Sequence, residues 1–424
     1  MLKEERSILW RTSSTCLGLA LPAVMLGNGI MYGLTVLGIL TGLLATKGMS
    51  LRATVMMVRH SKLMWLLLCL LAALGVSSLL GISPDYSLHK TGQVAAMMVI
   101  ALLLFAALRE MPGRYTNILQ RSLVVGVVSM VLLAWVDAFA DSHRLSAALH
   151  GVEKALTVHR LNFHSTAIAL LLPFVWAFYA RRLREREPLV KMSAPIVLPI
   201  SLATVFLCGG RAGMIAVVVS LIAFLALGAQ RFNFNLHARH WLATLGSIAA
   251  GVGAYILSRG NLGAFWERLE VSQGDRGLGG GRWEIWQTSW NHLLDQPLTG
   301  IGPNAFRHLP ENVDFHPHNA LLQLALETGL IGTVLAAGGM LLLLTMFYRY
   351  AQSNVFGLAG LTALLGYLAS AMFSKSIFDM EWLAILTLLL CIGWRLGWSR
   401  GQKLEGDIVH TGNFLEELKS KKSA

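Results

Sequence analysis

Charged residues are scarce in this chain of 424 residues. Only 14% of the residues are charged, whereas 55% are hydrophobic, and the mean hydropathy is +0.58. A chain with so few charges has more apolar surface than one soluble core can bury. The composition therefore argues against an ordinary soluble domain and predicts an all-α polytopic membrane protein, because helices satisfy their own backbone groups in lipid.

Cysteine is also rare, which excludes several kinds of site. The four cysteines, Cys16, Cys69, Cys208 and Cys391, all fall within or at the end of apolar runs and show no metal-type spacing, so we interpret them as packing residues. The sequence also lacks the GxSxG and HExxH motifs. The net charge of +12 is not gathered on a soluble basic face with interleaved aromatics, which argues against a nucleic-acid partner.

What the sequence does contain is a series of apolar runs near the length of roughly 17 to 25 residues that crosses a bilayer as a helix. We count about twelve, at 8–27, 29–46, 63–81, 93–108, 122–140, 164–180, 194–208, 212–228, 241–257, 329–348, 355–373 and 380–398. We expect the first run to be retained, since no small-residue cleavage site follows it. The predicted organisation is nine membrane helices in 1–257, one large loop in 258–328, three membrane helices in 329–398 and a polar tail in 399–424.

Basic residues predict the orientation of these runs, because loops rich in Lys and Arg stay in the cytoplasm. Most of the 35 basic residues fall in alternate connections, within 3–11, 47–62, 109–121, 181–191, 231–239, 349 and 395–422. Both termini are therefore expected in the cytoplasm, with the large loop on the outer side. The basic net charge is then mostly a consequence of topology.

The large loop holds two recognisable patterns. The glycine-rich stretch GDRGLGGG (274–281) lacks the Gly-Lys-Ser/Thr ending of a phosphate loop, and we interpret it as a mobile hinge or lid. In the helical stretch that follows, Trp283, Trp286, Trp290 and Leu293 recur at spacings of 3, 4 and 3. This spacing puts three indoles and a leucine on one face, and predicts a helix that lies along the outer interface with membrane lipids.

The loop ends in FHPHNALLQLALETGLIG (315–332), where two histidines flank a proline. Pro317 is suited to the first turn of a helix, which would place His318 in that turn. The positive end of the helix dipole disfavours a charged imidazole there, and a neutral imidazole is what a general base requires. For His316 an exposed interfacial role is favoured. A zinc site would need a third ligand, and none stands at a convincing spacing.

Polar residues continue along this helix at a spacing of four. Asn319, Gln323 and Glu327 form a stripe within an otherwise apolar segment, and such a stripe should face protein or water. The side chains either support a reaction site or simply satisfy one another between helices. For Gln323 the second alternative is favoured.

Two arginines stand on the same predicted side of the membrane. Arg211 lies in the tight turn CGGRAG, and Arg282 opens the Trp-rich helix. Either arginine alone is consistent with a side chain that reaches toward lipid headgroups. Together with a neutral histidine they suit an anionic substrate such as a diphosphate, because guanidinium binds phosphate through paired donors.

These residues carry a resemblance to a known family. The pattern is Arg282-x3-Trp286, Pro297-x2-Gly300-x-Gly302 and His318-Asn319-x2-Leu322-x4-Glu327-x-Gly329-x2-Gly332. It resembles the signature of the O-antigen ligase and polymerase superfamily over about fifty residues, and Gly210-Arg211-Ala212-Gly213 is similar to the family's other arginine motif. One dominant outer loop late in the chain, without an added C-terminal domain, is most similar to the lipopolysaccharide O-antigen ligases.

The resemblance implies a fold of the membrane glycosyltransferase C type and transfer of a polysaccharide from undecaprenyl diphosphate to a sugar hydroxyl of lipid A-core. It implies a metal-independent, inverting reaction that needs no cofactor, in the periplasmic leaflet of the bacterial inner membrane. Arg211 and Arg282 would bind the diphosphate and His318 would be the base. The family sometimes carries an acid at the position of Asp379, which either orients His318 or an arginine or is an ordinary loop residue.

Three alternatives remain open at this stage. An O-antigen polymerase and a protein O-oligosaccharyltransferase share the arginine and histidine pattern. A twelve-span transporter or lipid flippase would show related halves with polar sites at mid-membrane, whereas here the polar groups collect at one surface.

Overall fold

The computed structural model describes residues 3–46, 49–59, 61–139, 158–232, 238–259, 282–310, 316–373 and 376–398, and every regular element within these ranges is a helix. The helices are α1 (Lys3–Ala20), η1 (Pro22–Met25), α2 (Asn28–Ala45), α3 (Met49–Arg59), α4 (Lys62–Leu80), α5 (Pro84–Arg109), α6 (Gly113–Phe139), α8 (Val158–Arg184), α9 (Pro188–Leu207), α10 (Arg211–Phe232), α11 (Ala238–Arg259), α13 (Arg282–Asp295), η2 (Ala305–His308), α14 (Ala320–Ala351), α15 (Val355–Ala371) and α16 (Met380–Gly397).

The helices confirm a polytopic membrane protein. In the described part of the chain, nine helices are long and apolar enough to cross a membrane, and α15 and residues Leu242–Leu257 of α11 are shorter apolar helices. Each of the twelve predicted runs coincides with a helix. The first run is misplaced, because α1 ends at Ala20 and the short helix η1 follows. Its charged first turns also keep α1 outside the nine candidates.

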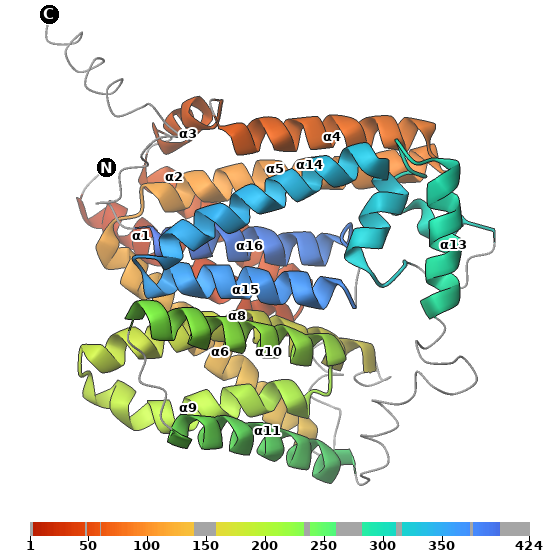
Figure 1. The fold of residues 1–424 in the computed structure, drawn as a ribbon. Helices are drawn as coiled ribbons and strands as arrows, with labels where there is room; N and C mark the ends of the chain where they lie inside the picture. Colours follow the sequence, from red (N-terminus) through yellow and green to blue (C-terminus); the bar gives the residue numbers. More distant parts are fainter. Residues whose placement is uncertain are drawn as a thin grey trace, which may run out of the picture.

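The long helices lie side by side with roughly parallel axes, and α13 crosses one end of the bundle (Figure 1). The opposite end holds the start of α1 and the end of α16. Ser7 of α1 accepts a hydrogen bond from Tyr115, and Arg395 of α16 donates to the Met111 carbonyl, so both helices meet the start of α6. We call these the α13 end and the basic end.

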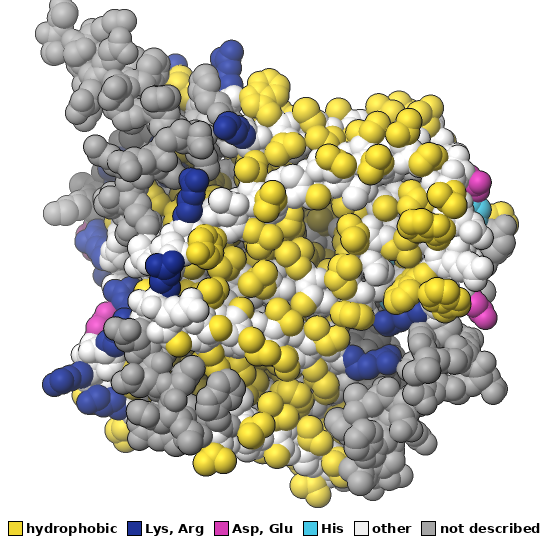
Figure 2. Space-filling view, in the orientation of Figure 1, with side chains coloured by type: hydrophobic (Ala, Val, Ile, Leu, Met, Phe, Trp, Pro, Cys, Tyr) yellow, Lys and Arg dark blue, Asp and Glu magenta, His cyan; other side chains and the backbone are white. Residues whose placement is uncertain are grey.

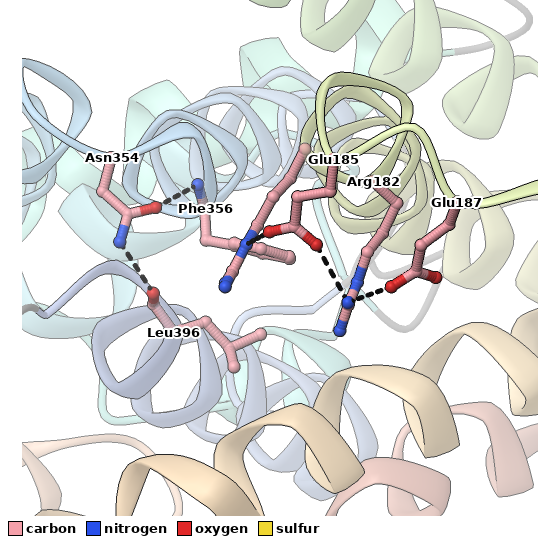
Figure 3. A network of polar contacts seen from close by, with 7 residues as sticks. Arg182, Glu185, Glu187, Asn354, Phe356 and Leu396 are labelled. Carbon is pink, nitrogen blue, oxygen red and sulfur yellow. Dashed lines mark hydrogen bonds and ion pairs between the residues drawn. The ribbon is translucent and has the colours of Figure 1, made fainter.

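The basic end carries most of the Lys and Arg side chains visible in Figure 2. Arg182, of which 7% is exposed, donates to Glu185 over 2.9 Å and also to Glu187, as Figure 3 shows. A hydrogen bond from Arg181 lowers the pKa of Glu185. In the described part of the chain, the helix ends that border the connections predicted to be cytoplasmic lie at this end (Figure 1). The assignment of that end to the cytoplasm stays a prediction.

Small residues let the helices pack closely, as expected where lipid offers no hydrophobic drive between helices. A Cβ on Gly18 would lie 2.6 Å from the Leu119 carbonyl oxygen of α6, and one on Gly38 would lie 2.6 Å from the Leu17 side chain of α1. At the basic end the Asn354 side chain accepts from the Phe356 amide over 2.8 Å and donates to the Leu396 carbonyl over 3.1 Å, which ties α15 to α16 (Figure 3).

Two sequence predictions fall on residues that the structure does not describe, namely the lid in 274–281 and the polar tail 399–424. One of the longer helices had not been predicted. Helix α3 follows the second membrane helix and carries Arg52 and Arg59 at the basic end.

Candidate functional site at the α13 end

The segment that carries the two histidines is hydrogen-bonded to the Trp-rich helix. The indole Nε1 of Trp286 donates to the carbonyl oxygen of Pro317 over 2.9 Å. Arg282 is the first residue of α13 and stands four residues before Trp286, so the two side chains share a helix face. The fold therefore brings the Arg282 face of α13 against the segment that carries His316 and His318, whose ring centroids are 4.2 Å apart.

The backbone around His318 differs from the sequence prediction. Helix α14 begins at Ala320, and the side chain of Asn319 caps it by accepting from the Leu322 amide over 3.0 Å. Pro317 is therefore outside the helix and His318 is not in the first turn. Asn is among the preferred N-cap residues because its short side chain reaches an amide left unpaired in the first turn, and it prevails here over the proline signal.

His318 instead adopts a left-handed backbone conformation, with φ of 55°. This conformation is uncommon for a residue other than glycine, although histidine tolerates it better than most. Such backbone strain costs about 1–3 kcal/mol and concentrates at functional sites. The conformation turns the chain immediately before the helix, next to the indole of Trp286.

The two residues of the polar stripe that lie within α14 are buried. None of the Gln323 or Glu327 surface is exposed. Gln323 Nε2 donates to Glu327 Oε2 over 3.0 Å and to Ser376 Oγ over 2.8 Å, and its Oε1 accepts from the Ile377 amide over 3.1 Å. For Gln323 the structure thus agrees with the alternative in which the groups satisfy one another.

The side chain of Glu327 is hydrogen-bonded to the backbone at the start of η2. Its carboxylate accepts from the Asn304 amide over 2.8 Å and from the Phe306 amide over 3.4 Å. Ser376 Oγ donates to Asn304 Oδ1 over 3.3 Å and closes the network. The network joins η2, the start of α14 and the segment before α16. Glu327 therefore helps to fix the positions of these three segments relative to one another.

The glycines of the motif explain how this turn fits against α14. Helix α14 is broken at Gly329, whose φ is 65°. The break leaves the Leu326 and Glu327 carbonyls free to accept from Ile301 and Gly302 over 2.9 and 3.0 Å, and the Pro297 carbonyl accepts from Leu330 over 2.8 Å. A Cβ on Gly329 would lie 2.2 Å from the Leu298 carbonyl oxygen, so the close approach requires glycine.

Arg211 lies at the same end on a different element. It is the first residue of α10 and is exposed. Its turn is held by Ser165 Oγ of α8, which contacts the Val205 and Gly210 carbonyls at 3.0 and 3.3 Å. Near the start of α8, Phe163 packs against Trp382 with ring centroids 5.1 Å apart, and Trp382 is in the first turn of α16. These contacts link the Arg211 turn to the segment that bonds Gln323.

Asp379 stands at the N-cap of α16 without a capping hydrogen bond from its side chain. Its charge acts on Lys90 and Tyr367, neither of which the sequence analysis had singled out. Whether Asp379 also orients His318 or an arginine stays a prediction. Within the described ranges, no group of three or more His, Cys, Asp or Glu side chains is arranged to hold a metal ion.

Helix α13 does not present its three indoles on one common face, contrary to the sequence prediction. Trp286 and Leu293 pack with Ile285 against a small core that includes Ile301, Phe306 and Leu326, while Trp283, Trp290 and Leu294 are 71%, 55% and 62% exposed. At 100° per residue these sets form two neighbouring arcs, so the indoles do not share one environment. Trp283 and Trp290 face outward, and Trp286 holds the histidine segment.

Sequence reasoning missed several residues at this end: Tyr86 and Lys90 of α5, Asn304, Arg307 and His308 around η2, and Ser376. Tyr86 lies more than 200 residues from Asn304, which donates to its hydroxyl over 3.1 Å. No spacing in the sequence signals a contact of this kind.

Comparison with known proteins adds one finding. Residues 196–337 match the model of the family described as O-antigen ligase. No curated protein sequence matches the chain. The matched region contains Arg211, the Arg282 helix, the glycine turn and His318, which are the elements that the structure gathers at the α13 end. The match shows that this part of the chain, about a third of its length, is similar to the O-antigen ligase family.

Proposed function

We propose that this protein is an O-antigen ligase of the bacterial inner membrane. It transfers polysaccharide from undecaprenyl diphosphate to a sugar hydroxyl of lipid A-core, at the periplasmic face. The observation that carries the proposal is the contact between Trp286 and Pro317, because it sets a cationic helix start beside a histidine. Transfer of a glycan from a diphosphate donor requires two chemical groups, one that binds the anionic diphosphate and one that accepts a proton.

In the proposed reaction the acceptor hydroxyl oxygen attacks the anomeric carbon of the donor from the face opposite the diphosphate. His318 takes the hydroxyl proton as the new carbon–oxygen bond forms. The bond between the anomeric carbon and the diphosphate oxygen breaks, and its electron pair stays on that oxygen. The configuration at the anomeric carbon is inverted, and undecaprenyl diphosphate is released.

Arg211 and Arg282 bind the diphosphate in this proposal. Both begin a helix, where unpaired backbone amides add to the positive potential. Charge on the leaving oxygen grows as the bond breaks, so donors already in place stabilise the transition state more than the ground state. The arginines then supply the charge that a metal ion provides in other transferases.

Metal independence is therefore part of the proposal. We expect that transfer by the purified protein is unchanged when a chelator is added, because guanidinium groups neutralise the leaving group. Loss of transfer in the chelator, with recovery on addition of a divalent ion, would contradict this part of the mechanism.

The deciding experiment supplies undecaprenyl-diphosphate glycan to the purified full chain with one of three acceptors: lipid A-core, a peptide or a second lipid-linked glycan. Extension of lipid A-core alone is the expected result. Extension of the lipid-linked glycan would identify a polymerase, and extension of the peptide would identify a protein oligosaccharyltransferase. Movement of the donor across proteoliposomes without bond formation would favour transport.

A further inference from the structure

A second group of cationic and aromatic side chains lies at the α13 end, around the ring of Tyr86. The Lys90 Nζ is 5.7 Å and the Arg307 Cζ is 5.4 Å from the centroid of this ring. The His308 ring stands edge-on to it, with centroids 4.8 Å apart. We call Tyr86, Lys90, Arg307 and His308 the Tyr86 cluster. It joins the first turns of α5 to η2.

The Tyr86 cluster is separate from the face of α13 that carries Arg282 and Trp286. Ala305 and Phe306 of η2 pack into the small core beneath α13. Arg307 and His308, the next two residues, meet Tyr86 on α5. The first two residues of η2 therefore pack toward α13, and its last two residues belong to the Tyr86 cluster.

The side chains of the Tyr86 cluster carry more hydrogen-bond donors than acceptors. The Tyr86 hydroxyl accepts from Asn304 Nδ2 over 3.1 Å, which leaves its own proton to be donated. Lys90 is half-buried, and its ammonium forms no hydrogen bond or ion pair with a described residue, although the charges of Asp379, Arg307 and Glu327 act on it. The Glu327 oxygens already accept backbone amides. An excess of donors beside two cations is matched by a phosphate group, which has acceptors only.

The surroundings of the Tyr86 cluster suit an amphiphile. Ile82 and Leu88 of the same segment are 43% and 40% exposed, and Leu79 and Leu80 at the end of α4 are 63% and 60% exposed. A phosphate bound by Lys90 would therefore lie beside a surface open to acyl chains. Through Asn304 and Ser376, the Tyr86 cluster is also bonded to Gln323, one helical turn from the Asn319 cap.

We propose that the Tyr86 cluster is a second phosphate subsite, which holds a phosphate group on the acceptor glycolipid while the arginines hold the donor. This inference rests on the proposed function for the identity of the acceptor. The binding site itself depends only on the geometry of α5 and η2. Lys90 and Arg307 pair with the phosphate, and Tyr86 donates its hydroxyl proton to it.

Binding of two acceptors to the full chain, held in phosphatidylcholine nanodiscs, tests the proposal without any transfer step. One acceptor is phosphorylated lipid A-core and the other is the same lipid after phosphatase treatment. We expect the wild type to bind the phosphorylated form about tenfold more tightly or better, as charge-assisted bonds allow. Lys90→Gln should remove most of this preference and Tyr86→Phe part of it, with binding of the dephosphorylated lipid unchanged.

Lys191→Gln is the matched control, because Lys191 is an exposed lysine at the basic end and should leave the preference intact. Equal binding of the two acceptors by the wild type overturns the proposal, as does a Lys90→Gln variant that keeps the full preference. Phosphatidylglycerol added to the nanodiscs should not abolish the preference. If it does, a bilayer phospholipid occupies the Tyr86 cluster and the acceptor assignment is wrong. Failure of the proposed function appears separately, as absence of glycan transfer.

Discussion

At the scale of single residues, His316 and His318 have different local structures although they are two positions apart. His318 has a left-handed backbone next to the cap of α14, whereas His316 stands one residue before Pro317. Their rings are in contact, so composition alone would treat them as equivalent. The backbone conformation at His318 is unfavourable, and such strain is concentrated at functional sites. The proposed role of His318 as the base agrees with this pattern.

We predict that His318→Ala lowers the rate of glycan transfer by roughly a hundredfold to ten thousandfold, the usual contribution of a general base. Donor affinity should stay close to that of the wild type, because the base acts on the acceptor hydroxyl. His316→Ala is the matched control and should cost far less. Transfer by His318→Ala at near the wild-type rate would remove the base assignment.

We predict that Arg211→Ala and Arg282→Ala each weaken binding of the undecaprenyl diphosphate donor and lower transfer by about a hundredfold or more. Lysine at either position should restore only part of the loss, since an ammonium cannot bind phosphate through a planar fork. Arg349→Ala, an exposed position at the basic end, is the control. Donor affinity that is unchanged in both variants would exclude the diphosphate role.

At the scale of elements, the 297–302 turn and the break in α14 form one unit. Glycine at 329 lets the helix open, and the freed carbonyls pair with the turn through Ile301 and Gly302. The same turn leads into η2, which Glu327 holds through two backbone amides. The unit positions the His318 segment, α13 and the Tyr86 cluster together, so a change in the unit should affect the whole α13 end.

We predict that Gly329→Ala lowers the free energy of unfolding by roughly 2 kcal/mol or more, because a left-handed backbone is costly for alanine and the new Cβ meets the Leu298 carbonyl. The control is Gly339→Ala in the same helix, where nothing lies within 4 Å of an added Cβ and alanine favours the helix. Thermal unfolding of the purified chain in detergent compares them. Equal unfolding temperatures would contradict the prediction.

At the scale of the whole molecule, the bundle has two unlike ends. Basic side chains gather at one end, and the described elements that carry the motif residues gather at the other (Figures 1 and 2). The membrane helices run from one end to the other. The basic end and the α13 end must therefore lie on opposite sides of the membrane. The positive-inside rule predicts that the basic end lies in the cytoplasm.

We predict that a cysteine at Leu298, on the α13 end, reacts with a membrane-impermeant maleimide in intact spheroplasts, and that one at Ser353, on the basic end, reacts only after lysis. Leu298 is 58% exposed and Ser353 is exposed. The background carries Cys69→Ser, because Cys69 is exposed whereas Cys16, Cys208 and Cys391 are buried. The reverse pattern of labelling would invert the topology.

The sequence alone predicted where the long apolar helices lie, because an apolar run of sufficient length is a local property that a bilayer selects. Nine of the helices in the described part of the chain are long and apolar enough to cross a membrane, so the predicted number of twelve spans stays a prediction. It also suggested Arg211, Arg282 and His318 as candidate site residues, since charged and polar residues beside apolar runs stand out in any linear pattern. Periodicity likewise predicted α13, which depends only on near neighbours in the chain.

Only the tertiary structure decided where these residues meet. The kink at Gly329 and the split of the α13 indoles depend on contacts with distant segments, as does the Tyr86 cluster, whose members join α5 to η2. Such contacts follow from close packing and from the need of each buried polar group for a partner. The spacing of residues along the chain does not show which groups will meet these two requirements, because the partners come together only in the fold.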